Sequence, residues 1–240
     1  MKTIALIALL ATAAIAQEAP APTPAAPKRS LLKYNVPASA TTGVRTDGDG
    51  GSRAGGAKLP SLSVLTPNHI AFTTQAQPSL FWFQSGPVEK GADVRFEVTL
   101  IDPKNPKPLL KAGIAVSGQK DGGAGIRRVQ LARHKVTLEP GVAYKWSVAL
   151  VPDAKNRAQD VTASGVIQRM EPAAELTAEL AKKDTDKAAA YAEKGVWYDA
   201  LAALSDQIDA NSKDATLRST RADLLEQAGL KSAAEFERKK

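Results

Sequence analysis

Two histidines, His69 and His134, are the candidates for acid–base chemistry in a sequence that contains no cysteine. A catalytic site needs a nucleophile, a base and a group that orients the base. The sequence contains neither a Gly-x-Ser-x-Gly motif nor a Walker-type phosphate loop, and His134 stands in the basic stretch Arg133-His134-Lys135. We therefore expect no catalytic residue and no cofactor, and interpret the protein as a non-enzyme. An unrecognised hydrolase is the alternative, because aspartates and glutamates are plentiful, although no pair of them stands out.

A metal site is suggested by one segment, Asp47-Gly48-Asp49-Gly50, which begins like a calcium-binding loop. Such a loop needs a bidentate glutamate at its twelfth position, which is Lys58 here. We therefore expect a flexible linker at this place and no metal site.

Positive charge is the strongest binding feature of this chain, whose net charge is +7. Basic residues on adjoining predicted strands could form one basic face, made of Arg127, Arg128, Arg133, Lys135, Lys145, Lys155 and Arg157. Such a face would suit an anionic polymer of the cell envelope. The alternative is an ordinary solvated strand face.

A second binding feature is Phe81-Trp82-Phe83, which is apolar on both faces of a predicted strand. The side chains on one face of the strand can enter a core, so the apolar side chains on the other face need to be covered by another part of the protein. We expect the C-terminal helices to dock there, through Trp197 or Tyr198. The alternative is an exposed aromatic patch that recruits a protein partner, and on that interpretation Trp82 and Trp197 are binding residues.

The first residues have the pattern of a secretory signal peptide: Lys2, an apolar run over 4–11, and Ala14-Ile15-Ala16. The apolar stretch is shorter than the roughly 20 residues of a membrane-spanning helix, so we expect cleavage after residue 16 and a periplasmic protein. A retained anchor is the alternative. We expect no membrane span in the rest of the chain and, in that compartment, no nucleic-acid partner.

Residues 17–58 are rich in proline and alanine and then in glycine, which predicts a disordered linker, interrupted by an apolar island at 31–36 that could dock on the folded part. From 59 to 170 the chain has many short strand-like runs between turns, and 94–100 alternates apolar and polar residues without a fault. This pattern predicts a mostly antiparallel β-sandwich of the immunoglobulin or fibronectin kind. The other predicted strands are 62–65, 69–72, 80–84, 113–116, 126–131, 136–138, 144–150 and 164–169, with a bulge or turn near Arg133.

The stretch Leu138-Glu139-Pro140-Gly141, followed by Tyr144 and Trp146, has the layout of a tyrosine corner. In that motif the phenol bonds to the backbone a few residues upstream and fixes the crossing between two sheets. The alternative is that Tyr144 is simply a half-buried strand aromatic.

Residues 171–240 change to a helical period, with a helix expected from Trp197. The expected N-caps are Asp184 and Asp214, and the expected helix stops are Gly195 and Gly229. The two glycines are 229 − 195 = 34 residues apart, which is the tetratricopeptide period. We therefore predict a small tetratricopeptide-like helical module after the sandwich, and an α+β chain overall.

Five motifs follow one another in a specific order: Gly50-Gly51-Ser52-Arg53, Pro78-Ser79-Leu80-Phe81-Trp82-Phe83, Leu138-Glu139-Pro140-Gly141 with Tyr144-x-Trp146, Asp153-x-x-Asn156-Arg157, and Gly195-x-Trp197-Tyr198-Asp199-Ala200-Leu201. In this order they resemble the bacterial family called domain of unknown function 928. The resemblance implies an exported protein without an established activity. We therefore expect a non-catalytic periplasmic binding or scaffold protein, with binding of an anionic envelope polysaccharide as the alternative function.

Overall fold

The computed structural model describes residues 32–38, 40–48, 59–88, 94–105, 107–116 and 123–240. These residues belong to one compact unit, which spans Leu31–Lys240. The expected signal peptide at 1–16 and the expected linker residues 17–31 and 49–58 lie outside the described residues. In the described part of the chain, no helix combines the length and the apolar character that crossing a membrane requires.

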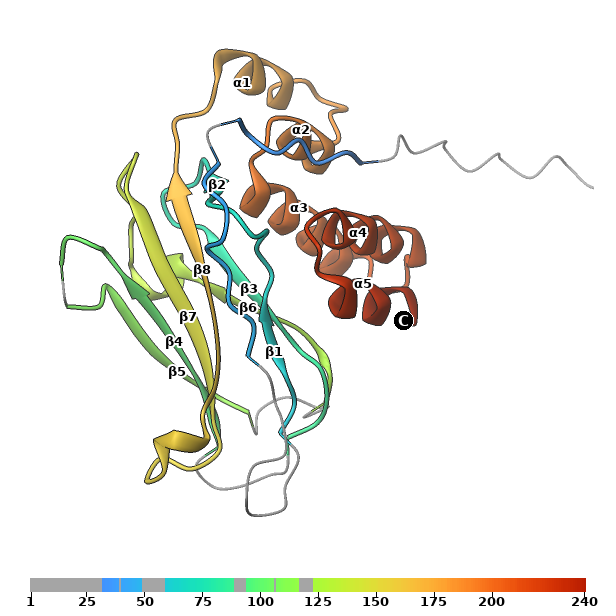
Figure 1. The fold of residues 1–240 in the computed structure, drawn as a ribbon. Helices are drawn as coiled ribbons and strands as arrows, with labels where there is room; N and C mark the ends of the chain where they lie inside the picture. Colours follow the sequence, from blue (N-terminus) through green and yellow to red (C-terminus); the bar gives the residue numbers. More distant parts are fainter. Residues whose placement is uncertain (1–31, 39, 49–58, 89–93, 106, 117–122) are drawn as a thin grey trace, which may run out of the picture. The chain divides into compact units, whose positions relative to one another are not determined.

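The protein is α+β, with two sheets of mostly antiparallel strands followed by C-terminal helices (Figure 1). The first sheet has the order β1-β3-β6, formed by β1 (Leu62–Val64), β3 (Ser79–Gln84) and β6 (Gly125–Gln130). The second has the order β2-β8-β7-β4-β5, formed by β2 (Ala71–Thr73), β8 (Val161–Arg169), β7 (Ala143–Val151), β4 (Arg95–Ile101) and β5 (Leu110–Ala115). β2 and β8 pair in parallel, whereas the other strand pairs described are antiparallel.

Strand β4 confirms the alternation predicted for 94–100. Phe96, Val98 and Leu100 are buried, and the residues between them are partly exposed, because successive side chains of a strand point to opposite faces. Phe96 meets Trp82 of the other sheet, with ring centroids 5.5 Å apart in an edge-to-face arrangement. Side chains of both sheets therefore fill one core.

The hydrogen bond expected of a tyrosine corner is present. The backbone nitrogen of Glu139 donates to the phenol oxygen of Tyr144 at 3.1 Å. Tyr144 lies at the start of β7 and is buried, so this bond satisfies a buried phenol and ties the incoming chain to the strand.

The strand predicted at 136–138 is wrong. A 3₁₀ helix at Leu131–His134 follows β6, and Lys135 then adopts a left-handed conformation with φ +56°. This turn directs the chain away from β6, so that the backbone nitrogen of Leu138 bonds to the carbonyl oxygen of Ala76 at 2.8 Å outside any ladder. The interruption expected near Arg133 is therefore this helical turn.

Five helices follow the sheets: α1 (Ala174–Leu180), α2 (Lys187–Glu193), α3 (Trp197–Ala210), α4 (Ala215–Gln227) and α5 (Lys231–Arg238). Gly195 and Gly229 have φ of +72° and +73° and follow α2 and α4 as predicted. Asp214 caps α4 as predicted, but α2 is capped by Asp186 and not by Asp184. The side chain of Asp186 accepts from two backbone nitrogens of α2, and a cap must stand directly before the first helical residue to do so.

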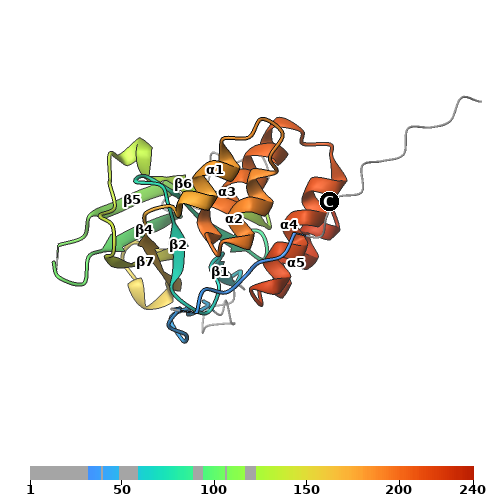
Figure 2. The same cartoon turned by 90° about the horizontal axis from the view of Figure 1, so that it is seen from above.

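The helices lie on one side of the sheets and cover the outer face of β3 (Figures 1 and 2). Phe83 contacts Phe236 of α5, with ring centroids 5.4 Å apart. The cover expected over β3 is therefore present, and the expected residues Trp197 and Tyr198 are buried in the same core as Phe81 and Phe83. Trp197 donates its indole hydrogen to the carbonyl oxygen of Leu65 at 2.8 Å, and Tyr198 accepts from the indole of Trp146 in β7 at 2.8 Å.

Part of the range expected to be linker lies against the folded elements. Leu32 and Tyr34 of the apolar island are buried, and the backbone nitrogen of Asn35 bonds to the carbonyl oxygen of Ala192 at 3.1 Å. Further along, Thr46 and Ser164 exchange backbone hydrogen bonds. This segment therefore connects the helices with β8.

Candidate functional site

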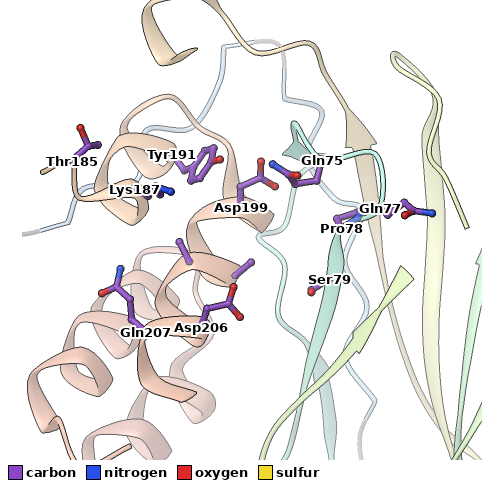
Figure 3. A pocket seen from close by; sticks show the side chains of 12 residues that line it. Gln75, Gln77, Pro78, Ser79, Thr185, Lys187, Tyr191, Asp199, Asp206 and Gln207 are labelled. Carbon is purple, nitrogen blue, oxygen red and sulfur yellow. The ribbon is translucent and has the colours of Figure 1, made fainter. Parts of the chain in front are cut away.

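A pocket of about 490 Å³ lies where α2 and α3 face the connection between β2 and β3 (Figure 3). Its wall presents side-chain amides, hydroxyl groups, charged groups and a small apolar surface. These are Gln75, Gln77 and Gln207; Ser79, Thr185 and Tyr191; Lys187, Asp199 and Asp206; and Pro78, Ala202 and Ala203. We call it the helix–sheet pocket.

Asp199 joins the two sides of this pocket. It stands in the first turn of α3 and is only 4% exposed. Its Oδ1 accepts from the hydroxyl of Thr73 at 2.5 Å, and its Oδ2 accepts from the backbone nitrogen of Thr74 at 2.9 Å and from the Thr74 hydroxyl at 2.5 Å. The carboxylate is thus bonded to the end of β2 and to the first residue of the β2–β3 connection, which fixes this wall of the pocket relative to α3.

Burial raises the pKa of the Asp199 carboxyl above its ordinary value, because the low-dielectric surroundings disfavour the charged form. The hydrogen bonds from Thr73 and Thr74 oppose this shift but are smaller in effect. Burial also raises the pKa of Tyr191, and the nearby Asp199 carboxylate adds to that effect. The side chains of Thr74 and Gln75 act in the opposite direction and lower the pKa of Tyr191, so the tyrosine lies beside the same group of polar side chains.

Asp206 is the second carboxylate of the pocket wall. It follows Asp199 by seven residues, which places it about two turns further along the same face of α3. Its Oδ1 lies 2.5 Å from a guanidinium nitrogen of Arg128 in β6, and the same guanidinium reaches Asp209 at 3.1 Å. Asp206 therefore links α3 to the three-stranded sheet.

A second pocket, of about 360 Å³, lies beside β6, the last strand in the order β1-β3-β6. Its walls come from β5, from β6 and from the 3₁₀ helix that follows, through Ile114, Arg128, Val129, Gln130, Arg133 and His134. Arg133 and His134 are exposed on the 3₁₀ helix. We call this the edge pocket.

The predicted basic face is not formed as one surface. Arg127 is 7% exposed, donates to the side-chain oxygen of Gln84 at 2.9 Å, and lies 5.4 Å from the ring centroid of Phe96. Its neighbour Arg128 points to the opposite face of β6, because side chains alternate along a strand.

The remaining basic residues are also separated. Arg157 is bonded to Glu97 and Asp160, and Lys145 stands on β7 of the other sheet. Arg128 and Arg133 meet in the edge pocket, and Lys135 is exposed directly after its 3₁₀ helix. The structure thus brings together one part of the predicted set.

The aromatic candidates lie in the core. Trp82 is 1% exposed and Trp197 is fully buried. Neither indole offers a surface to a ligand, so the interpretation of these two residues as binding residues does not fit their burial.

The sequence interpretation missed Asp199, Thr74 and Tyr191. One signal was available, because Asp199 stands in the first turn of a helix between apolar residues that are all expected inside. A carboxylate in such a place needs donors to compensate its burial, but the sequence does not say which segment supplies them. Among the described residues, no group of three or more histidine, aspartate or glutamate side chains is placed to hold a metal ion.

The family comparison agrees with the motif order. The sequence model of Domain of Unknown Function 928 (DUF928) matches residues 48–237, which include both sheets, both pockets and the helices up to α5. The chain therefore belongs to the DUF928 family, and the predicted resemblance is confirmed. No curated protein matches the chain.

Proposed function

We propose that this protein is an exported, non-catalytic binding protein of the cell envelope that holds its ligand in the helix–sheet pocket. The observation that carries the proposal is the way the pocket is built. Its wall is fixed by the bonds of Asp199 to Thr73 and Thr74, and side-chain amides and hydroxyls are among the groups that line the volume. Rigid walls with polar groups at fixed places favour specific binding, because little ordering is needed when the ligand enters.

The architecture supports this proposal, because we interpret the sheets as a scaffold and the C-terminal helices as an interaction module. We interpret the two sheets, within residues 59–170, as an immunoglobulin-like sandwich, a reading supported by the Trp82–Phe96 contact and the Tyr144 bond. Residues 171–240 then form a tetratricopeptide-like pair of repeats, a reading supported by the equivalent conformations of Gly195 and Gly229.

The engagement of both carboxylates supports a non-catalytic role. A glycosidase of the common kind needs one carboxyl group that gives a proton and a second that activates water or attacks the sugar. Both oxygens of Asp199 accept hydrogen bonds from the protein, and Asp206 is bonded to Arg128. These bonds support a structural role for the two carboxylates, in which they join α3 to the sheets.

The proposal is tested by filling the pocket. Ala203 is half-buried in the pocket wall, and Ala203→Trp would occupy the space with an indole ring. The control is Ala154→Trp in the exposed loop after β7. The immobilised full chain is incubated with labelled envelope polysaccharide and periplasmic protein, and the retained material is measured together with the melting temperature of each variant.

We expect the wild type and Ala154→Trp to retain the same material, and Ala203→Trp to lose at least about nine-tenths of it while still melting cooperatively, because a filled pocket leaves no room for the ligand. Equal retention by Ala203→Trp would show that this pocket is not the site. If the retained polysaccharide or protein became shorter during incubation, the protein would be a catalyst, and the proposal that it is non-catalytic would be overturned.

Export is tested separately by sequencing the N-terminus of the protein recovered from a periplasmic fraction. The signal-peptide pattern at the start of the chain predicts that it begins with Gln17. A protein that keeps its first residues and sediments with membranes would support the retained anchor.

A further inference from the structure

The helix–sheet pocket and the edge pocket meet at one ion pair. Asp206 lines the first and Arg128 lines the second, and their side chains are bonded at 2.5 Å. Ser79 of the first pocket and Gln130 of the second are also paired directly across β3 and β6. Directly opposed residues of an antiparallel pair lie about 5 Å apart, so the two pockets are neighbours.

The two pockets differ in chemistry. The helix–sheet pocket is lined by the charged Lys187, Asp199 and Asp206 and by the neutral side-chain amides of Gln75, Gln77 and Gln207. An amide side chain can both donate and accept hydrogen bonds, and the nitrogen of Gln77 already donates to the hydroxyl of Thr137 at 3.2 Å. Sugar hydroxyl groups also donate and accept, so they match such a wall. Ala202 and Ala203 add a shallow apolar surface, which suits the C–H face of a sugar ring better than a large side chain.

The edge pocket is cationic. Its described lining includes Arg128, Arg133 and His134 but no aspartate or glutamate. The charge of Arg128 is shared with Asp206 and Asp209, so the available positive charge comes from Arg133, which forms no ion pair within the described part of the chain. A guanidinium group with its donors exposed is suited to a carboxylate, which it binds through two parallel hydrogen bonds.

We infer that the ligand is an acidic polysaccharide, with neutral sugar hydroxyls in the helix–sheet pocket and a uronate carboxylate against Arg133 in the edge pocket. This inference rests on the proposed binding function and names its ligand class. A peptide partner fits less well, because peptides are usually anchored by a large apolar side chain in a deep pocket. The apolar lining of the helix–sheet pocket is formed by Pro78, Ala202 and Ala203, which are small.

The experiment compares three probes by calorimetry with the full chain at low ionic strength: a hexamer of galacturonate, a neutral hexamer of glucose and a hexamer of glutamate. Arg133→Gln removes the charge at the edge pocket. Lys145→Gln is the matched control, because it removes one exposed positive charge on β7 of the other sheet. Ala203→Trp, which fills the helix–sheet pocket, is measured with the same probes.

We expect the galacturonate hexamer to bind at least about fivefold more tightly than the other two probes, since its carboxylates add a charge-assisted hydrogen bond to the neutral contacts. Arg133→Gln should weaken its binding by about five- to tenfold and make it less sensitive to salt, while Lys145→Gln changes it by less than about twofold. Ala203→Trp should abolish the binding of the galacturonate hexamer.

Equal affinity for the neutral hexamer, tighter binding of the glutamate hexamer, binding of no probe, or equal effects of Arg133→Gln and Lys145→Gln would each overturn the inference. The proposed function fails separately, when Ala203→Trp retains envelope material as well as the wild type does. Loss of envelope retention in Ala203→Trp without a preference for galacturonate would leave the pocket as the site and remove the acidic polysaccharide as its ligand.

Discussion

Trp146 of β7 donates its indole hydrogen to the phenol oxygen of Tyr198 in α3, at 2.8 Å. Both side chains are fully buried, and the Tyr198 hydroxyl lies 3.4 Å from the carbonyl oxygen of Val166, to which it donates. Burial raises the pKa of this phenol well above its ordinary value. One neutral hydroxyl therefore satisfies an indole of the five-stranded sheet and ties the helices to that sheet.

Replacing Tyr198 by phenylalanine should destabilise the protein by about 1–3 kcal/mol, because the buried indole hydrogen of Trp146 loses its acceptor. Urea unfolding of Tyr198→Phe measures the loss. In a double-mutant cycle, Tyr198→Phe with Trp146→Phe should cost less than the sum of the two single changes. Additive effects would show that the two residues stabilise the protein independently.

Gly195 and Gly229 have the same left-handed conformation but different surroundings. A Cβ atom at Gly229 would meet nothing within 4 Å, whereas one at Gly195 would lie 2.5 Å from a ring carbon of Pro37 and 2.8 Å from the carbonyl oxygen of Asn35. Gly229→Ala should therefore cost about 1–2 kcal/mol, the ordinary cost of a left-handed alanine.

Gly195→Ala should cost more than this and should also displace the segment at 35–37. Urea unfolding compares the two variants. Hydrogen exchange at the amide of Asn35, which bonds to Ala192, reports the displacement. Equal unfolding free energies with unchanged exchange at Asn35 would contradict the packing of this segment on α2.

The stability of the protein should depend on pH through Asp199. Its pKa is raised in the folded state, so the folded protein keeps this proton at pH values where the unfolded chain, with an ordinary value of 3.8, has lost it. The contribution of Asp199 is therefore complete below that value and declines as the pH rises through the folded pKa.

We expect the wild-type unfolding free energy, relative to that of Asp199→Asn, to be largest near pH 4 and to decrease toward pH 7, since asparagine does not titrate. Urea titrations of both proteins across this range measure the difference. A wild-type advantage that grows with pH would mean that the bonds from Thr73 and Thr74 outweigh burial and that the pKa is lowered.

The N-cap of α2 gives a comparison between two nearby aspartates. Asp186→Ala should cost about 1 kcal/mol, because two backbone nitrogens of the first turn lose their acceptor. Asp184→Ala should change the unfolding free energy by less than about half of that, as expected for an exposed residue outside the cap. Thermal unfolding of both variants decides which aspartate is the cap.

Several features that depend on residues close in sequence were predicted correctly, although the N-cap of α2 is Asp186 and not the expected Asp184. The buried face of β4 follows from strict alternation, and the start of α3 and the turns at Gly195 and Gly229 follow from helix period and glycine chemistry. The bond between Glu139 and Tyr144 spans five residues, so one short motif contains both partners. The error at 136–138 arose because Lys135 adopts a left-handed turn that its residue type does not signal.

Other features depended on contacts between distant parts of the chain. Arg127 and Arg128 are neighbours in sequence, yet the first is buried beside Gln84 and Phe96 while the second reaches α3. The sequence shows that both residues are charged, but it does not show which parts of the protein their side chains pack against. Counting the basic residues in the sequence therefore overestimates the positive charge that is available to bind a ligand.

By itself, the sequence determined the family, through the order of motifs along most of the chain. It also determined the change from strands to helices and the turns at Gly195 and Gly229, because these depend on residues within a few positions of one another. The tertiary structure decided the pocket. Asp199 and Thr74 are separated by 125 residues, and only the packing of α3 against β2 brings the carboxylate to its donors. Whether a polar side chain is buried or bonded depends on which distant residues pack against it. The tertiary structure therefore decides which polar side chains remain available to bind a ligand.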